Sequence, residues 1–424
     1  MERQFFVDNR KKLMSKVPDN VAVFLFAGKN RQMSADTDFK FLPDRNFYYL
    51  TGIDEPGAIL VLIKRNNDDY EETLYIASHT ALEDRWRGKV ISASQAAEIS
   101  GVDEIRDIKL FESEAYAIIQ DNTFRIASDG SSIMETPRLF AQNVGAVRGD
   151  ECLVDIKNEL IFMRMIKMPC EIEAIRKAAR ITEEAFRATK QLIKPGVSEL
   201  ELYSRIEYEM SIRGSLIPAF ETIVANEGNS FCLHHPKPDL SKAGIVRDNG
   251  YVQFDVGARF DGYCADISRV CFVEELTPAQ EKVLELVQDL RKRAFGFIRP
   301  GVTFDELNKE LSDAVTSWLL NQDLGRNEGK SNSSNINCNS KSKSSPIEAS
   351  SYVWHGASHH LGLDVHDVGP RTSPFEAGNC LAVEPGVYIP EWGVGFRIED
   401  DVVVTETGVE LLSSGEDSKL SCIC

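Results

Sequence analysis

The sequence predicts a protein of the α/β (α+β) class with two domains, an N-terminal mixed α/β domain at residues 1–160 and a second domain at residues 165–424. Three observations predict this division. Short apolar runs alternate with polar segments in the first part, long helical patterns begin at Pro169, and one octapeptide motif occurs twice in the second part. With 424 residues, of which 42% are hydrophobic, the chain can bury the cores of two such domains.

The composition predicts a globular protein with no nucleic-acid and no membrane partner. A formal net charge of −18 argues against a general affinity for nucleic acid or anionic membranes. The opening segment MERQFFVDNRKKLMSKVPDN carries charge where a signal peptide needs an apolar core. We therefore expect a cytoplasmic protein, and the nine cysteines fit reduced thiols better than a disulfide framework.

The first domain is predicted to be a scaffold with few chemically active groups. Its apolar runs VAVFLF, GAILVLI and ETLYIAS have the length and composition of strands. His79 is its only histidine, and a structural role is expected for it.

The second domain is predicted to consist of two related halves. The motif PGVSELEL at 195–202 returns as PGVTFDEL at 300–307. Each copy follows a long helical pattern, starts another helix with a hydroxyl N-cap and an acid three residues later, and is followed by a pair of strands. The polar segment at 325–346 predicts a disordered surface loop, with a lid over the site as the alternative.

The strand-like run VQFDVGARFDGYCADISRV carries two acids, Asp255 and Asp266. An ionised carboxylate among apolar residues needs a partner, and the alternative for Asp255 is a solvent-facing position. A two-residue turn at Asp261-Gly262 places Asp266 opposite Gly257, on the same face as Asp255. Such diagonal neighbours lie ~7–8 Å apart, a span that suits metal ions.

The second half contains the corresponding hairpin, CLAVEPGVYIPEWGVGFRIEDDVVV. Its turn lies at Pro-Glu-Trp-Gly, so Glu384 and Glu399 are expected opposite each other. The two hairpins would then bring four carboxylates together between the halves. Four such groups cannot all stay ionised without cations among them.

All histidines except His79 fall in two short segments, LHHP at 233–236 and HGASHHLGLDVHD at 355–367. Next to a carboxylate site, this concentration predicts ligand, proton-transfer and oxyanion roles. Carboxylates with one imidazole suit Mn, Mg, Fe or Co better than structural zinc. Two ions ~3.5–4 Å apart can hold a bridging water for amide hydrolysis.

Four segments together, DVGARFDGYCADISR, HGASHHLGLDVHDVG, VEPGVYI and RIEDD, resemble the pita-bread metallopeptidases, and among them the Xaa-Pro aminopeptidases (aminopeptidase P). The resemblance covers nearly the whole chain. The segment DTDFKFLPDRNFYYLTGIDEPGAILVLI resembles the N-terminal domain of aminopeptidase P and prolidase. The resemblance therefore implies such a domain at 1–160 and a pseudo-symmetric pita-bread catalytic domain at 165–424.

The resemblance also implies the roles of individual residues. The metal ligands would be Asp255, Asp266, His359, Glu384 and Glu399, of which Asp266 and Glu399 bridge two ions. His234 and His366 would contact the substrate carbonyl and stabilise the gem-diolate, His355 would line the proline pocket, and Glu384 would also take the proton of the water.

Two further residues have competing interpretations. Arg397 lies two residues before Glu399 and could orient a ligand carboxylate through a forked ion pair, or form a purely structural salt bridge. Tyr388 resembles a family tyrosine that binds substrate, and simple packing is the alternative. The chain departs from the family at Trp354, where relatives usually have proline, and in its longer loop at 325–346. These departures concern substrate access.

The resemblance predicts a dinuclear metal-dependent aminopeptidase that releases the N-terminal residue from peptides with proline in second position. Mn²⁺ is the expected metal, with Co²⁺, Fe²⁺ and Zn²⁺ as alternatives, and a homodimer or homotetramer is expected by analogy. Two alternatives stay open, an Xaa-Pro dipeptidase (prolidase) and a non-catalytic peptide-binding module of the same fold.

Overall fold

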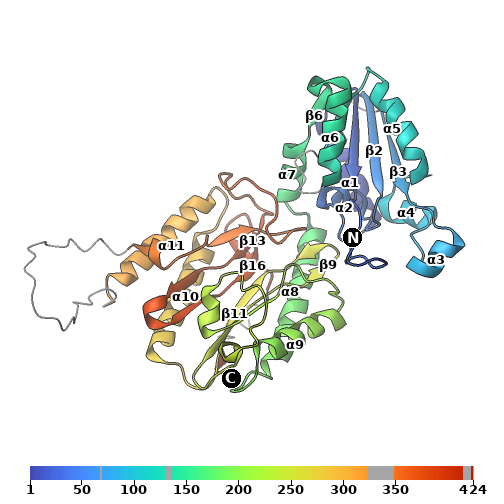
Figure 1. Cartoon of the computed structure of the whole chain (residues 1–424). Helices are drawn as coiled ribbons and strands as arrows, with labels where there is room; N and C mark the ends of the chain where they lie inside the picture. Colours follow the sequence, from blue (N-terminus) through green and yellow to red (C-terminus); the bar gives the residue numbers. More distant parts are fainter. Residues whose placement is uncertain (67–68, 130–134, 323–347, 414–421, 424) are drawn as a thin grey trace, which may run out of the picture. The chain divides into compact units, whose positions relative to one another are not determined.

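The computed structural model describes residues 1–66, 69–129, 135–322, 348–413 and 422–423 (Figure 1). The chain divides into two compact units, Met1–Arg164 and Met165–Cys424. The polar loop predicted at 325–346 lies outside the described residues. No helix in the described part of the chain combines the length and apolar character needed to cross a membrane.

Unit 1 is built around a six-stranded mixed sheet with the order β4-β3-β2-β1-β5-β6. Its strands are β1 (Val21–Phe26), β2 (Ile59–Asn66), β3 (Asp69–Ile76), β4 (Glu104–Asp107), β5 (Arg125–Ser128) and β6 (Leu153–Asp155). Its helices are α1 (Arg3–Lys16), α2 (Arg45–Thr51), α3 (Ala81–Arg87), α4 (Ala93–Ser100), α5 (Phe111–Gln120), α6 (Glu135–Arg148) and α7 (Lys157–Met165).

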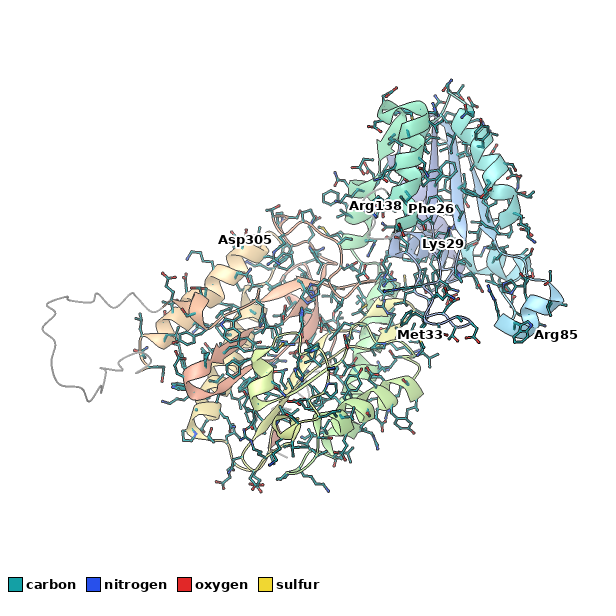
Figure 2. The ribbon with its side chains drawn as sticks, in the orientation of Figure 1. Phe26, Lys29, Met33, Arg85, Arg138 and Asp305 are labelled. Carbon is teal, nitrogen blue, oxygen red and sulfur yellow. The ribbon has the colours of Figure 1, made fainter. Side chains whose placement is uncertain are left out.

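The apolar run VAVFLF forms β1, in which all six residues are buried. Phe24 and Phe26 point to one face of the sheet, where they meet Phe111 of α5 and Phe140 of α6. Figure 2 shows Phe26 inside this unit. The predicted mixed α/β character of the first domain is confirmed.

Unit 2 contains two halves with the same order of elements. The first half has α8 (Pro169–Lys190), α9 (Glu199–Ile212), β7 (Ile223–Asn226), β8 (Tyr251–Val256), β9 (Arg259–Phe260), β10 (Tyr263–Cys264) and β11 (Ile267–Phe272). The second half has α10 (Pro278–Phe297), α11 (Phe304–Leu319), β12 (Ser358–His360), β13 (Cys380–Val383), β14 (Gly386–Ile389), β15 (Val394–Arg397), β16 (Asp400–Val404) and β17 (Val409–Leu411).

The duplicated motif has the same structure in both halves. Ser198 and Thr303 each cap the following helix, in a capping box with an acid three residues later. Gly196 and Gly301 both have left-handed backbones, with φ of 92° and 91°. The two halves then form sheets of matching order, β7-β8-β11 with β18 (Cys422–Ile423) and β12-β13-β16-β17. The predicted duplication is confirmed.

The alternation of side chains along β8 separates the core from the interface between the halves. Val252, Phe254 and Val256 pack against α8 and α9 in one apolar cluster. Gln253 and Asp255 therefore point to the opposite face, where the second half lies. Gln253 accepts a hydrogen bond from the backbone of Arg397 there, at 3.0 Å.

Candidate metal centre

The hairpin of the first half has the predicted register. Its turn, Asp261-Gly262, has positive φ at both residues, 48° and 82°, as a type I′ turn requires. Asp255 pairs with Ser268, so Asp266 falls opposite Gly257 where the ladder is interrupted. Asp255 is only 7% exposed. The solvent-facing alternative for Asp255 is therefore wrong.

The hairpin of the second half also has the predicted register. β13 pairs with β16 and β14 pairs with β15 in two separate antiparallel ladders that keep the same register. Glu384 and Glu399 stand opposite each other in the gap between these two ladders, as expected. The backbone N–H of Glu399 donates to the carbonyl of Ser268 at 3.1 Å, so this gap lies against the first half.

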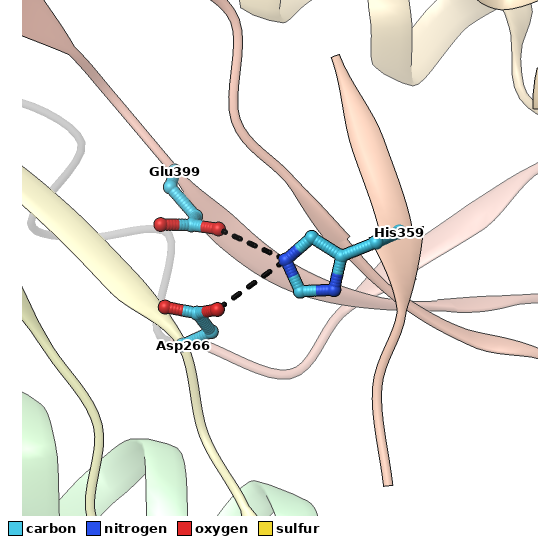
Figure 3. Close-up of side chains that lie close together, drawn as sticks. All are labelled: Asp266, His359 and Glu399. Atoms are coloured by element: carbon cyan, nitrogen blue, oxygen red, sulfur yellow. Dashed lines mark ion pairs between the residues drawn. The ribbon is translucent and has the colours of Figure 1, made fainter. Parts of the chain in front are cut away.

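The acids of both halves converge on His359, which lies on β12 (Figure 3). Its Nε2 is 3.4 Å from Asp266 Oδ2 and 3.8 Å from Glu399 Oε1. Glu384 Oε1 is also 3.8 Å from this nitrogen. One ligand atom from each of Asp266, His359 and Glu399 lies within 4.8 Å of the other two. The two hairpins thus contribute to one centre.

Burial and mutual repulsion make the carboxylates of this centre costly to ionise. Burial, together with the neighbouring acids, holds the pKa of Asp266 and of Glu399 well above their usual range, and the guanidinium of Arg397 opposes this only partly. Burial raises the pKa of Glu384 to about 7 against the opposing effect of His359. A positive charge is needed among these groups.

The donor set fits a divalent cation. Asp255 Oδ1 and Glu399 Oε1 are buried and have no hydrogen-bond partner among the described residues. His359 Nδ1 lies 3.0 Å from the carbonyl of His360, and since a carbonyl only accepts, this nitrogen donates. With Nδ1 held by this carbonyl, Nε2 is the ring nitrogen that faces the carboxylates, as in a metal-binding histidine.

A layer of polar residues that sequence reasoning missed supports the acids. The backbone N–H of Asp266 donates to both carboxylate oxygens of Asp401, at 3.2 and 3.1 Å. Arg269 bonds the carbonyl of Glu399 at 2.5 Å and the carboxylate of Asp400 at 2.8 Å. The acidic run around Glu399 was the only sequence signal for Asp400 and Asp401, and it did not distinguish them from the predicted ligand.

Arg397 forms the ion pair that its position suggested, with Asp255 as partner. The pair is made through Nη2 alone, so the predicted forked geometry is wrong. The same Nη2 donates to the carbonyl of Leu233 at 3.2 Å. Arg397 thereby connects Asp255 to the segment that carries the first histidine cluster.

A cavity of about 640 Å³ opens onto the centre. It is lined by the four acids and His359, by three other predicted residues (His234, His355 and His366) and by Arg397. Its remaining wall is mostly apolar, with Phe220, Ile223, Leu233, Pro236 and Val365. The structure therefore brings nearly all predicted site residues onto one cavity.

The three histidines occupy different parts of this wall. The ring of His366 stacks on that of His359 with centroids 4.1 Å apart. His355 Nδ1 donates to the carbonyl of Gly356 at 2.9 Å and lies 3.4 Å from Glu384 Oε2. Burial lowers the pKa of His355 to about 4, which keeps this ring neutral. His234 is exposed to the cavity.

Tyr388 lies behind the wall of the cavity. It is fully buried, and its hydroxyl is 3.0 Å from His355 Nε2, to which it donates because Nδ1 already carries the ring proton. Its ring stacks on Trp354, with centroids 4.8 Å apart and planes at 11°. Tyr388 thus contacts His355, which lines the cavity, but does not line the cavity itself.

Two charged cavity residues, Glu221 and Arg371, were not predicted. Both are exposed, and each is a single charged residue in a segment without regular pattern. The guanidinium of Arg371 lies over the ring of Phe304, 5.5 Å from its centroid. No spacing rule connects either residue to the acidic hairpins, so the sequence offered no signal for them.

Comparison with known proteins agrees with this geometry. The family model described as metallopeptidase family M24 matches residues 173–406, and the model described as aminopeptidase P, N-terminal domain, matches residues 6–126. The chain belongs to metallopeptidase family M24. Membership of a metallopeptidase family implies that the chain uses divalent metal ions.

Curated relatives and solved structures of the family cover nearly the whole chain. The Xaa-Pro aminopeptidase of Escherichia coli (strain K12) is 29% identical, over 98% of this chain and 95% of its own length. Xaa-Pro aminopeptidase 3 of Homo sapiens is 28% identical, over 96% of this chain and 82% of its own. The low-pH form of aminopeptidase P from E. coli aligns with a TM-score of 0.84 at 27% identity, over 99% and 98% of the two chains. Proline aminopeptidase P II from Yersinia pestis aligns with a TM-score of 0.82 at 27% identity, over 98% and 96%. The predicted pita-bread fold is confirmed.

Proposed function

We propose that this M24 metallopeptidase is an Xaa-Pro aminopeptidase, which removes the first residue from peptides with proline in second position. The convergence of acids from both halves on His359 Nε2, next to a cavity of about 640 Å³, carries the proposal. The relatives named above are Xaa-Pro aminopeptidases, so the dipeptidase alternative is not favoured. All five expected ligand residues are present, which argues against a non-catalytic binding module.

The proposed metal ligands are Asp255, Asp266, His359, Glu384 and Glu399, with two Mn²⁺ ions as the preferred metal. When bound, such ions polarise a carbonyl and lower the pKa of a water molecule. The mixture of four carboxylates and one imidazole, without thiolates, supports manganese over a structural zinc site. One carboxylate oxygen of Asp255 (Oδ1) and one of Glu399 (Oε1) are buried without a hydrogen-bond partner among the described residues, which supports their assignment as ligands.

The proposed reaction is hydrolysis of the bond between the first residue and proline. Glu384 takes a proton from the attacking water and delivers it to the prolyl nitrogen as the bond breaks. His234 and His366 donate hydrogen bonds to the carbonyl oxygen while negative charge develops on it. His355, held by Tyr388, lines the pocket for the proline ring, and Arg397 orients Asp255 through their ion pair.

The test is cleavage of Ala-Pro-Ala, Ala-Pro and Ala-Ala-Ala after removal of metal with a chelator and after return of Mn²⁺, Co²⁺, Fe²⁺ or Zn²⁺. We expect rapid release of alanine from Ala-Pro-Ala alone, loss of that activity with chelator, and its best recovery with Mn²⁺. Equal cleavage of Ala-Ala-Ala, or activity indifferent to the chelator, would contradict the proposal. Preference for Ala-Pro would indicate the dipeptidase.

We further propose a cytoplasmic homodimer or homotetramer that has proline-containing peptides as its partners. The acidic net charge of −18 supports the absence of nucleic-acid and membrane partners. Sedimentation equilibrium of the purified chain and fractionation of cells test these two points.

A further inference from the structure

The segment 227–250, between β7 and β8, forms the part of the cavity wall that carries His234. Leu233, His234, His235 and Pro236 of this segment all line the cavity. Apart from the short 3-10 turns Glu227–Phe231 and Lys242–Gly244, the segment has no helix or strand. Since it has no ladder of its own over His234 and His235, contacts from elsewhere must hold these side chains in place.

One buried carboxylate, that of Glu199, makes four of these contacts along the stretch from Asn226 to Asp239. Glu199 is the first residue of α9 and is 0% exposed. Its Oε1 accepts from the backbone N–H of Asn226 at 2.6 Å and from Asn229 Nδ2 at 2.8 Å. Its Oε2 accepts from the backbone N–H of Asp239 at 2.6 Å and faces His235 Nε2 at 3.2 Å. Four donors saturate the two oxygens of one carboxylate.

The positions of these donors span the whole histidine-bearing stretch. Asn226 precedes His234 and Asp239 follows it, so Glu199 holds both ends of the stretch 226–239 by hydrogen bonds. We call residues 226–239 the clasped stretch. Because a carboxylate only accepts, His235 Nε2 must donate, which fixes the orientation of that ring on the cavity wall. The carbonyl of Leu233, within the clasped stretch, accepts from Arg397 Nη2.

A helix-capping role does not explain Glu199. The N-terminus of α9 already has a complete capping box, in which Ser198 and Glu201 satisfy each other's backbone N–H groups. The four hydrogen-bond partners of Glu199 described above all belong to the segment from Asn226 to Asp239, and none to the helix. A second observation, its complete burial, shows that its contacts replace water entirely.

We propose that Glu199 is a positioning residue of the proposed peptidase reaction, which acts through His234 and His235 by clasping the stretch that carries them. The inference rests on the proposed function of His234. Glu199 touches neither the metal ligands nor the cavity, so its removal affects the reaction only by letting the clasped stretch move.

The first experiment replaces Glu199 by glutamine and compares it with Glu201→Gln, an exposed position on the same helical turn. The amide of Glu199→Gln keeps one acceptor oxygen but turns its NH₂ toward two donors. We expect kcat for Ala-Pro-Ala with Mn²⁺ to fall about 10- to 100-fold with little change in KM and unchanged bound metal. Glu201→Gln should stay within about twofold, because glutamine also completes a capping box. Wild-type kcat in Glu199→Gln would overturn the proposal.

The second experiment distinguishes positioning from a general loss of structure. In a His234→Ala background, Glu199→Gln should lower kcat for Ala-Pro-Ala by a clearly smaller factor than it does in the wild-type chain, because the effects of residues that act as a unit are not additive. An equal fall of kcat in both backgrounds would overturn the proposal. If His234→Ala alone retains full activity, the proposed role of His234 fails instead.

Hydrogen exchange supplies a readout that needs no activity. In the metal-free chain, amides at 227–239 should exchange about tenfold faster in Glu199→Gln, while those of β8 stay protected. Unchanged exchange at 227–239 would overturn the proposal. Should Glu199→Gln fail to fold, Asn229→Ala removes one donor from the same carboxylate, and both measurements are made on it with a smaller expected change in the same direction.

Discussion

The two halves of unit 2 share a backbone but hold their functional loops by different chemistry. In each half, the loop between the first two strands carries a cavity histidine, His234 at 227–250 and His366 at 361–379. Each half also places one acid directly before its last hairpin strand, Asp266 before β11 and Glu399 before β16. These two acids, with His359, form a group within the described residues that could hold a metal ion.

The difference lies at the first residue after the duplicated N-cap. In the first half this residue is Glu199, which clasps the loop of His234 by hydrogen bonds. In the second half it is Phe304, which packs edge-on against His360, with ring centroids 5.0 Å apart. There an ion pair between Lys167 and Asp367 holds the loop, with both side chains 1% exposed. The two halves thus share the same helices and strands, but different residues hold the loop that carries the cavity histidine in each half.

The largest effects should come from the two equivalent acids. We expect Asp266→Asn and Glu399→Gln each to reduce kcat/KM at least roughly 10³-fold, because either change removes a proposed ligand of a metal that would supply several kcal/mol in the transition state. Both should bind less Mn²⁺, as metal analysis of the dialysed protein would show. Since each change removes one of several buried, mutually repelling carboxylates, the metal-free variants should melt at or above the wild-type temperature.

A clear asymmetry between these variants would contradict the equivalence of the halves. Glu391→Gln, in the exposed turn of the second hairpin, is the matched control and should leave metal content and activity unchanged.

Local chemistry explains what could be predicted from the sequence. The type I′ turn at Asp261-Gly262 and the antiparallel pairing set the register within each hairpin, so the placement of two acids on each hairpin followed from short-range rules. The meeting of Asp266 with Glu399 was expected only because the duplicated motif indicated two facing halves. The capping boxes at Ser198 and Thr303 are equally local. Sheet pairing and helix starts depend on residues a few positions apart, and the sequence displays those directly.

The missed residues all act across long distances in the chain. Glu199 with Asp239, Lys167 with Asp367, and Arg269 with Asp400 meet only after the sheets have assembled. No spacing pattern reports such pairs. For the same reason the sequence placed Arg397 next to a ligand carboxylate but gave the wrong contact geometry, because one nitrogen also serves the carbonyl of Leu233.

The next largest effect should be the loss of the buried ion pair in the second half. Lys167→Met breaks the buried ion pair with Asp367, so we expect unfolding of unit 2 to become about 3–5 kcal/mol easier in urea. Lys309→Met, which removes an exposed pair with Asp313, should cost at most about 1 kcal/mol. Equal costs at the two sites would show that the pair does not anchor the loop of His366.

Loss of either loop histidine, His234 or His366, should lower kcat by a similar factor, although different contacts hold the two loops. We expect His234→Ala and His366→Ala each to lower kcat for Ala-Pro-Ala about 10²–10³-fold, the usual cost of removing one hydrogen-bond donor from a developing oxyanion. Bound metal should not change. His79→Ala, in unit 1, is the control for histidine loss in general. A large effect from one loop histidine alone would restrict the oxyanion role to one half.

The smallest effect concerns the aromatic contact that joins the halves. Phe231, from the loop of the first half, meets Trp354 of the second half with centroids 5.8 Å apart, and Trp354 stacks on Tyr388, which bonds His355. Aromatic pairs contribute about 0.5–1.5 kcal/mol beyond burial, so Trp354→Ala should raise KM for Xaa-Pro peptides roughly 2- to 10-fold with kcat nearly unchanged. Trp354→Phe keeps a stacking ring and should recover most of the loss. If Trp354→Ala instead lowered kcat and left KM unchanged, the ring would act on the chemistry through His355, and the two halves would be coupled at the reacting bond as well as at the substrate pocket.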